Sequence, residues 1–380
     1  MSITVLQSPL EISPAYMPLN LVASSSNTID NYLTRLTIGA NPPIDFYDPP
    51  RPDGKLWRDL HRTVESFIKP DITLIKRQTV TPSLNVEVNN YIAEYSFIVA
   101  EVVSGVSGSP TGASSTKYGW GGAFRWNDFI RGNAQDYVLQ GTDPQKPLTN
   151  KKVVKLLPDE LTEIGWIKTV ASDATSIKVT KTPYSGSPTT ESYTIGSNIN
   201  FSLILGLGGF KQIEVYAIDA IGTPPNDRRS ESVFIIPQTD CPTGEPIQIY
   251  YLNPLGRFDT FTFMAKHTTE LQAAKETLSN VIGSVGTSAY EYDTMQHRVK
   301  TYKSTFKDRM TLRSLWLNDM DSSLMGELVS SPMAYAKIDN EIYPVNIVTN
   351  NWEVKYRSRN GLFAGEIEIE FGYDNYRQRL

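Results

Sequence analysis

The stretch 250–263, "YYLNPLGRFDTFTF", decides how the second half of this chain is interpreted, because it has the pattern of an aromatic β-hairpin. The tetrad 253–256, "NPLG", is a turn signal, with Pro suited to the second position and Asn and Gly at the ends. On the outgoing arm Asp259, Phe261 and Phe263 fall on one side of the strand, because successive side chains of a strand alternate. The sequence therefore predicts a hairpin with one covered face.

The aromatic side chains of this hairpin need a surface to cover them. Each aromatic ring buries about 150–250 Å² when it is packed, which is more apolar area than a lone exposed hairpin tolerates. We expect the cover to come either from the rest of the C-terminal domain or from a neighbouring subunit. The candidate assembly contacts are Tyr16, Tyr250, Tyr251, Phe258, Phe261 and Phe263.

The composition is that of a folded protein. The chain has 380 residues, 40% of them hydrophobic and 20% charged, and its formal net charge is −5. This length predicts two or three domains, and the charge disfavours both disorder and a specific nucleic-acid-binding surface. The single cysteine, Cys241, cannot form an intrachain disulfide, which favours folding in a reducing cell interior.

The N-terminal segment is expected to be an extended arm. It lacks the charged region and apolar run of a secretory signal, and no run of about 18 apolar residues occurs in the chain, so we expect neither export nor a membrane span. Pro9, Pro14 and Pro18 are spaced too closely for a helix. We expect residues 1–25 to lie on another surface, so that deleting 2–20 leaves the domains folded and weakens assembly.

Strand-like segments separated by turn residues run through most of the chain, which predicts a mainly β protein. The expected architecture is multi-domain: immunoglobulin-like or β-sandwich units, a C-terminal α+β domain and the extended N-terminal arm. The Pro-containing run 235–246 marks the last joint. The predicted domains are 1–25 (the arm), 26–150 (a sandwich with one helix and a long loop), 151–240 (a second sandwich) and 241–380 (β-rich with a short helix).

Two helices are expected from their patterns. In 55–68, "KLWRDLHRTVESFI", apolar residues recur every fourth position behind a cluster of chain breakers. In the C-terminal domain, Asp321 is the expected N-cap of a helix whose buried stripe is Leu324, Met325 and Leu328. The segment 268–284 stays open, because its propensity favours helix while its place after the hairpin favours a strand.

The segment 104–123 is rich in Gly, Ser and Thr and is expected to form a long loop. Tyr118 and Trp120 lie within it and are candidate loop contacts. They could form an interaction surface, or they could pin down a mobile insertion.

The residues that would carry catalysis or hold a metal form no recognisable constellation. The histidines His61, His267 and His297 are far apart in sequence, and His61 is expected to be a boundary residue. The alternating Glu366, Glu368 and Glu370 could flank a bound metal, but a charged solvent face, answered by Arg357 and Arg359, is favoured. The trio Asp159, Glu160 and Glu163 is interpreted as an exposed acidic turn and not as a glycosidase pair. Short basic patches are Lys151, Lys152 and Lys155, and Arg377 and Arg379.

Several stretches in one order resemble a known group of proteins. They are "SPLEISPAYMPLNLVASSSN", "PPRPDGKLWRDLHRTVESFI", "FRWNDFI" with "KPLTN", "CPTGEPIQIYYLNPLGRFDTFTF" and "LRSLWLNDMDSSLMGELVSSPMAYAKID", with the end "NNWEVKYRSRNGLFAGEIEIEFGYDNYRQRL". Together they resemble tail or neck structural proteins of tailed bacteriophages and prophages of Bacteroidota, including crAss-like phages. The loop 104–123 and the stretch "TELQAAKETLSNVIGS" depart from the pattern.

The resemblance implies a virion component, made in the host cytoplasm, that assembles as an oligomer with cyclic symmetry. Its expected partners are other virion proteins in the tail, the baseplate, the neck or collar, or near the portal. The resemblance implies no catalytic residues and no cofactor. The alternative is a receptor- or glycan-binding adhesin at the tail periphery, in which Tyr118 and Trp120 stack on a host sugar.

Overall fold

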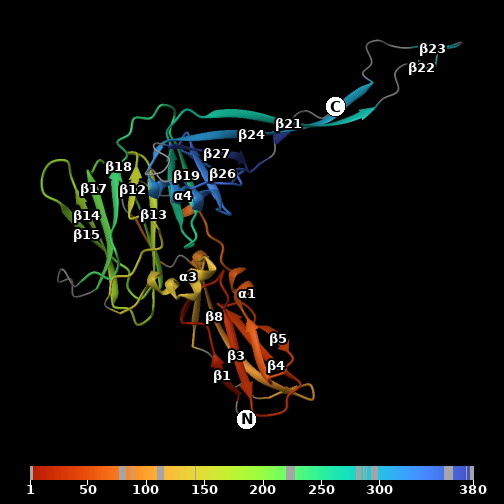
Figure 1. The fold of residues 1–380 in the computed structure, drawn as a ribbon, viewed down its shortest axis with the longest axis vertical. Helices are drawn as coiled ribbons and strands as arrows, with labels where there is room; N and C mark the ends of the chain where they lie inside the picture. The colour runs from red at the N-terminus through yellow and green to blue at the C-terminus, as the bar shows by residue number, and fades with distance from the viewer. Residues whose placement is uncertain are drawn as a thin grey trace. The chain divides into compact units, whose positions relative to one another are not determined.

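The computed structural model describes residues 3–76, 83–86, 89–108, 115–141, 143–219, 227–279, 284–285, 287, 289–291, 298–354, 363–373 and 375–376. The chain divides into two compact units. Unit 1 comprises Met1–Thr239 together with Leu252–Asp259, and unit 2 comprises Asp240–Tyr251 and Thr260–Leu380. Strands dominate both units (Figure 1), which confirms the mainly β prediction.

The first β-sandwich of unit 1 is built from two sheets. One has the strand order β1-β3-β6, and the other the order β2-β10-β8-β4-β5 with β9 beside β8. Side chains from both sheets, among them Leu21, Ala23, Tyr95 and Phe97, form one core. The strands are β1 (Ile3–Gln7), β2 (Ile12–Pro14), β3 (Asn20–Ser25), β4 (Asn31–Ile38), β5 (Ile44–Asp48), β6 (Lys55–Asp59), β8 (Ile92–Val103), β9 (Val106–Ser107) and β10 (Lys117–Trp120).

The N-terminal segment is extended, and the surface on which it lies is the first sandwich itself. Strand β1 pairs with β3, and β2 pairs in parallel with β10. Ile12, Ala15 and Leu19 are fully buried. Deleting 2–20 would remove core side chains, so the expectation that the domains stay folded without this segment is corrected.

The helix predicted over 55–68 is wrong over its first third. Residues 55–59 form strand β6, which pairs with β3, and only α1 (His61–Glu65) is helical. Asp59 accepts hydrogen bonds through Oδ1 from the N–H groups of Leu19, at 2.9 Å, and His61, at 3.1 Å. The four apolar residues that recur at every fourth position are all buried: Leu56, Leu60, Val64 and Ile68. A strand followed by a short helix therefore directs the same side chains into the core. Tertiary pairing has overridden local propensity.

The second β-sandwich of unit 1 packs the sheet β11-β13-β16-β7 against the sheet β12-β18-β17-β14-β15. Trp166 and Phe201 stack at its centre with their ring centroids 5.9 Å apart. Its strands are β7 (Ser83–Val86), β11 (Val138–Leu139), β12 (Val153–Leu156), β13 (Leu161–Lys168), β14 (Ala174–Thr182), β15 (Thr189–Thr194), β16 (Asn200–Gly206), β17 (Gln212–Asp219) and β18 (Val233–Pro237). The short helices of unit 1, besides α1, are α2 (Thr73–Lys76), η1 (Asn89–Tyr91), α3 (Trp126–Ile130) and η2 (Asn133–Tyr137).

Unit 2 is an α+β unit. Its eight-stranded sheet has the order β20-β19-β25-β26-β27-β24-β21, with β28 beside β24, and α4 packs on one face of it through Met325 and Leu328. The strands are β19 (Ile247–Leu252), β20 (Phe258–Phe263), β21 (Thr268–Ser279), β24 (Val299–Leu317), β25 (Ala334–Ile338), β26 (Glu341–Ile347), β27 (Phe363–Phe371) and β28 (Asn375–Tyr376). A separate two-stranded sheet pairs β22 (Ser284–Val285) with β23 (Tyr290–Glu291).

Helix α4 (Asp319–Val329) confirms the predicted helix and its buried stripe, but its N-cap is Asn318 and not Asp321. The side chain of Asn318 accepts a hydrogen bond from the backbone N–H of Asp321 at 2.7 Å. The open segment 268–284 resolves as strand over 268–279, where β21 pairs with β24 along its whole length. Residues 280–283 lie outside the described residues.

Candidate functional site

The aromatic residues of the predicted hairpin are covered by the chain itself. Tyr250, Tyr251, Phe258 and Phe263 are each at most 1% exposed. Phe261 is half-buried, and its ring lies 4.9 Å from that of Phe263. This corrects the expectation that the four buried rings are contacts to a neighbouring subunit, because side chains covered within one chain offer no surface to another.

The turn of this hairpin has the predicted form. The N–H of Gly256 donates to the carbonyl oxygen of Asn253 at 3.0 Å, which closes the tetrad 253–256. Gly256 has a φ of +78°, and a Cβ placed there would lie 2.6 Å from the backbone of Gly121. Glycine is therefore required at position 256, both for the positive φ and because the backbone of Gly121 lies too close for a side chain. We call Leu252–Asp259 the hairpin tip; it belongs to unit 1, whereas the arms of the hairpin belong to unit 2.

Asn253 holds the hairpin tip in shape. Its Oδ1 accepts from the backbone N–H groups of Leu255 and Arg257, each at 3.0 Å. Its Nδ2 donates to the carbonyl oxygen of Leu148 at 3.1 Å and to Oδ2 of Asp259 at 2.9 Å. One buried amide thus joins the turn, its outgoing strand and the preceding chain of unit 1, so that these buried polar groups are satisfied.

Arg257 buries a positive charge in the interior of unit 1. Its guanidinium Cζ lies 4.3 Å from the ring centroid of Tyr91, and its Nη1 lies 3.7 Å from Oε1 of Glu163. Its Nη2 donates to Oδ1 of Asn200. A Cβ on Gly165 would lie 2.4 Å from Nε of Arg257, so the side chain passes over a position where only glycine leaves room.

Burial dominates the electrostatics around the hairpin tip. It raises the pKa of Glu163, while the positive charge of Arg257 opposes that rise. It lowers the pKa of Arg257, and the negative charge of Glu163 opposes that fall. Burial also raises the pKa of Asp259, which accepts a hydrogen bond from Oγ1 of Thr149 at 2.9 Å. Paired buried charges of this kind fix a geometry more than they add stability.

The acidic trio of 159–163 is not an exposed turn. Glu160 and Glu163 are 4% and 2% exposed, whereas Asp159 is exposed. Glu163 lies on β13, which is buried along its length. Ile164 and Trp166 pack into the core of the second sandwich, and Glu163, on the other face of the strand, meets Arg257. The partner of Glu163, Arg257, is 94 positions later in the chain, and no local spacing links the two. A charged residue inside the apolar run "LTEIGWI" was the one sequence signal for this pair.

The other predicted contact residues, Tyr16, Tyr118 and Trp120, differ in how exposed they are. Tyr16 is 41% exposed and stays a candidate contact. Trp120 is not in a loop: it ends strand β10, is 2% exposed and packs edge to face against Phe124. The prediction that the Trp120 ring stacks on a ligand is therefore wrong, because the ring is buried. Tyr118, on the same strand, is half-buried and lines a surface cavity of about 510 Å³. Residues 109–114 of the predicted loop lie outside the described residues.

Strands β21 and β24 form a long two-stranded ribbon at one edge of the sheet in unit 2, and Figure 1 shows them running side by side. Every one of the 12 residues of β21 is exposed. Leu271 and Leu278 on β21, and Val299 and Tyr302 on β24, are between 44% and 57% exposed. This is the largest uncovered element that the described residues form.

The carboxylate row of β27 is a charged face, as favoured from the sequence, and the cations that pair with it among the described residues come from β24. Lys307 Nζ lies 2.7 Å from Glu370, and Arg313 Nε lies 2.7 Å from Glu366. Arg357 and Arg359 lie outside the described residues, as do Arg377, Arg379 and His297. Nδ1 of His61 lies 2.8 Å from Asp59. Within the described part of the chain, no group of three or more His, Cys, Asp or Glu residues is placed to hold a metal ion.

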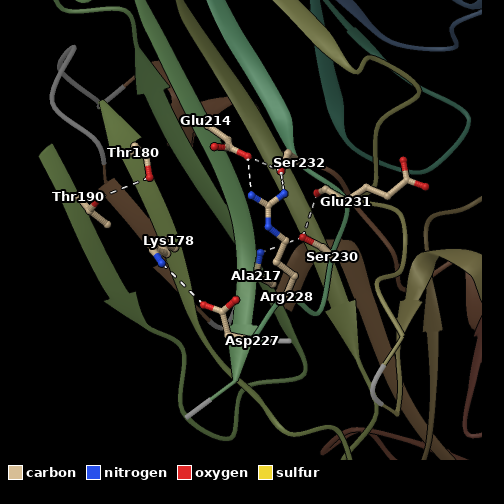
Figure 2. Close-up of polar contacts among 10 residues, drawn as sticks. All are labelled: Lys178, Thr180, Thr190, Glu214, Ala217, Asp227, Arg228, Ser230, Glu231 and Ser232. Atoms are coloured by element: carbon tan, nitrogen blue, oxygen red, sulfur yellow. Dashed lines mark hydrogen bonds and ion pairs between the residues drawn. The ribbon is translucent and has the colours of Figure 1, made fainter. Parts of the chain in front are cut away.

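The outer face of the second sandwich carries a polar network. Figure 2 shows the guanidinium of Arg228 directed at Glu214 and Ser232, at 3.1 and 2.9 Å, and Lys178 directed at Asp227, at 3.7 Å. The same guanidinium stacks on the ring of Tyr216 at 4.2 Å. These charges are paired within the chain, so the network is a stabilised sheet face and not an open anion-binding site.

Comparison with known proteins assigns no family to this chain. No family model matches it, and no curated protein matches it. Among solved structures, a two-domain fibronectin type III segment from chicken tenascin is 13% identical, covers 61% of this chain and 95% of its own, and has a TM-score of 0.22. The FN1–FN3 domains of chicken CNTN1 are 10% identical, cover 82% of this chain and 91% of their own, and have a TM-score of 0.20. At such TM-scores the fold assignment rests on the sheets and cores described above. In the described residues, no helix is long and apolar enough to cross a membrane.

Proposed function

We propose that this chain is a structural component of a tailed bacteriophage particle, placed in the tail, baseplate or neck, whose work is contact with copies of itself and with neighbouring virion proteins. The phage setting rests on the sequence resemblance. The assembly role is supported by one observation above all: a 12-residue strand, β21, that is exposed along its whole length.

The physical argument begins with the open edge of β21. This strand ends the strand order of its sheet, and among the described strands it pairs with β24. A two-stranded ribbon is marginally stable in water by itself, and an edge strand presents a row of N–H and C=O groups that another strand can pair with. A strand from a neighbouring subunit would use those groups by β-augmentation.

Exposed apolar side chains on the ribbon also favour an interface. Leu278 on β21 and Val299 and Tyr302 on β24 are 57%, 57% and 44% exposed, and all three lie beyond the cross-strand pair Ala274 and Thr305. Charged pairs are interspersed with them, as where Lys303 Nζ lies 2.7 Å from Glu276. Apolar side chains on an exposed ribbon are suited to a covering partner.

The test is to shorten the ribbon without disturbing the sheet. Ala274 and Thr305 are cross-strand partners, and Thr305 still pairs with β28, so residues 275–304 can be replaced by the two-residue turn Asn-Gly. We expect the full chain to form a closed oligomer by light scattering and analytical ultracentrifugation, and the shortened chain to stay monomeric with an unchanged melting temperature. A full chain that remains monomeric at high concentration, or a shortened chain that assembles equally well, would contradict the proposal.

A glycan-binding adhesin has less support. Stacking on a sugar needs exposed ring faces, and one of the two proposed rings, that of Trp120, is 2% exposed. Binding of the purified chain to a glycan array separates the two functions, because an assembly component selects no sugar.

A further inference from the structure

A surface cavity in unit 1, of about 510 Å³, lies where the first sandwich meets the turn before strand β16. Glu94 on β8 and Tyr118 on β10 are direct cross-strand partners, so their side chains stand on the same face of the sheet. That face is the outer one, because the neighbouring residues Ala93 and Tyr95 point into the core of the first sandwich. A cavity of this size is within the range of ligand-binding pockets.

Part of the wall of the cavity is aromatic and aliphatic. The rings of Tyr118 and Phe67 are both half-buried, as are the side chains of Ile92 and Ile199. An aromatic ring that is partly exposed in a concave site offers a negative π-face to a cation. The cavity is thus built for a ligand with an apolar stem and a positively charged head.

The polar groups of the rim include one carboxylate and two amides whose orientation is fixed by hydrogen bonds. Glu94 is exposed and carries the negative charge of the rim. Asn41 and Asn198 each donate through Nδ2 to a backbone carbonyl of their own turn, that of Ile38 and that of Ile195, at 2.9 Å. These bonds fix the two amides, whose carbonyl oxygens are acceptors.

The charged side chain in the lining of the cavity is Glu94. Arg257, which donates to the lining residue Asn200 from the interior, is paired with Glu163. None of the residues that line the cavity, all of which are described, is Lys or Arg. The nearby Lys168 donates to the carbonyl oxygens of Gly196 and Ala174, at 2.7 and 2.8 Å, and is 4% exposed. Burial, and then the negative charges of Glu94 and Glu11, raise the pKa of Tyr118.

We propose that this cavity binds an arginine or lysine side chain presented by an extended segment of a neighbouring protein. The charged head lies between the rings of Tyr118 and Phe67 and the carboxylate of Glu94, and its methylene stem packs on Ile92 and Ile199. This site is separate from the ribbon of unit 2, so it goes beyond the proposed function, and each can fail without the other.

The probe for this site is an acetylated tetra-arginine amide, and its matched control is the tetra-citrulline peptide, which keeps the shape and removes the charge. By calorimetry at low salt, we expect tetra-arginine to bind the full chain about tenfold more tightly than tetra-citrulline. Glu94→Gln should weaken tetra-arginine binding about tenfold, and Glu245→Gln, the same charge change at an exposed position in unit 2, should not. The chain lacking 275–304 should bind like the full chain.

Three results would contradict the proposed site. The first is that tetra-arginine and tetra-citrulline bind with equal affinity. The second is that Glu94→Gln and Glu245→Gln lose the same affinity for tetra-arginine, and the third is that a neutral oligosaccharide binds in place of the peptide in a way that depends on Tyr118. Because Glu94 is exposed, its variant is expected to keep the melting temperature of the full chain, and Tyr118→Phe, which keeps the π-face, should retain at least half of the affinity for tetra-arginine.

Discussion

Arg257 shows how strongly single residues of the hairpin tip depend on their partners. It is 1% exposed, and Glu163, which faces it, is 2% exposed. Removing one partner of a buried ion pair leaves the other charge without compensation. We expect Arg257→Met to lower the free energy of unfolding by about 3–5 kcal/mol in urea titrations at neutral pH.

A double variant checks the cause of that loss. With Glu163→Leu added to Arg257→Met, no charge is left unpaired, and most of the lost stability should return, because apolar replacements of buried ion pairs are often neutral. If the two losses simply add, the pair does not act as a unit and the interpretation of the hairpin tip fails.

Asp173 gives a pH-dependent prediction at the same scale. A hydrogen bond from Arg229, whose Nε lies 2.6 Å from Oδ1, lowers the pKa of Asp173 below its ordinary value of 3.8. A carboxyl whose pKa is lowered by folding stabilises the folded state above its unfolded pKa, and that contribution is lost as the pH falls through the lower, folded value. Asp173→Asn should therefore melt at a lower temperature than the parent chain at neutral pH, and the difference should shrink as the pH falls below 3.8 and through the lower, folded pKa. A difference that stays constant over this range would exclude the ionised pair as its cause.

At the scale of elements, the start of helix α4 separates two candidates for one role. Asn318 accepts from the N–H of Asp321, whereas the sequence alone favoured Asp321 as the cap. We expect Asn318→Ala to cost about 1 kcal/mol of stability, the usual loss for an N-cap, measured by urea unfolding. Asp321→Ala, within the first turn, should cost less than Asn318→Ala, since it keeps the backbone N–H that Asn318 caps. Equal losses would mean that the cap observed here does not carry the helix start.

Which elements could be predicted from sequence depended on where their stabilising contacts lie. The turn 253–256 and the alternation of Ile367 and Ile369 with glutamates were predictable, because turn chemistry and period-2 patterning are local. The strand at 55–59 was not, because the hydrogen bonds that define it come from β3, about 35 residues earlier. The same holds for 268–279, where a helical composition forms a strand along β24.

At the scale of the whole molecule, the sequence could not predict which residues contact the hairpin. The aromatic hairpin was recognisable at 250–263, but Glu163, Asn200 and Thr149, which contact its residues Arg257 and Asp259, are 57 to 110 positions away from them. No periodicity or motif encodes contacts of that range. The aromatic count predicted that the hairpin must be covered, and only the fold decides that unit 1 of the same chain covers its tip.

Unit 1 is discontinuous, and this gives the last prediction. Leu255 packs in a core cluster with Ile12 and Trp120, and Phe258 meets Tyr91 edge to face with 6.4 Å between ring centroids. A chain that ends at Thr239 lacks these side chains and leaves Glu163 buried without its cation. In a second chain, residues 240–251 are replaced by a Gly/Ser spacer of equal length and the sequence ends at Asp259. We expect the chain that ends at Thr239 to have a much lower melting temperature than this second chain, measured by circular dichroism at matched concentration. A third chain, with the spacer and Leu255→Ala, Arg257→Met and Phe258→Ala, controls for the added length and should melt like the first. If all three chains had the same melting temperature, the hairpin tip would contribute nothing to the stability of unit 1, although its side chains are buried there.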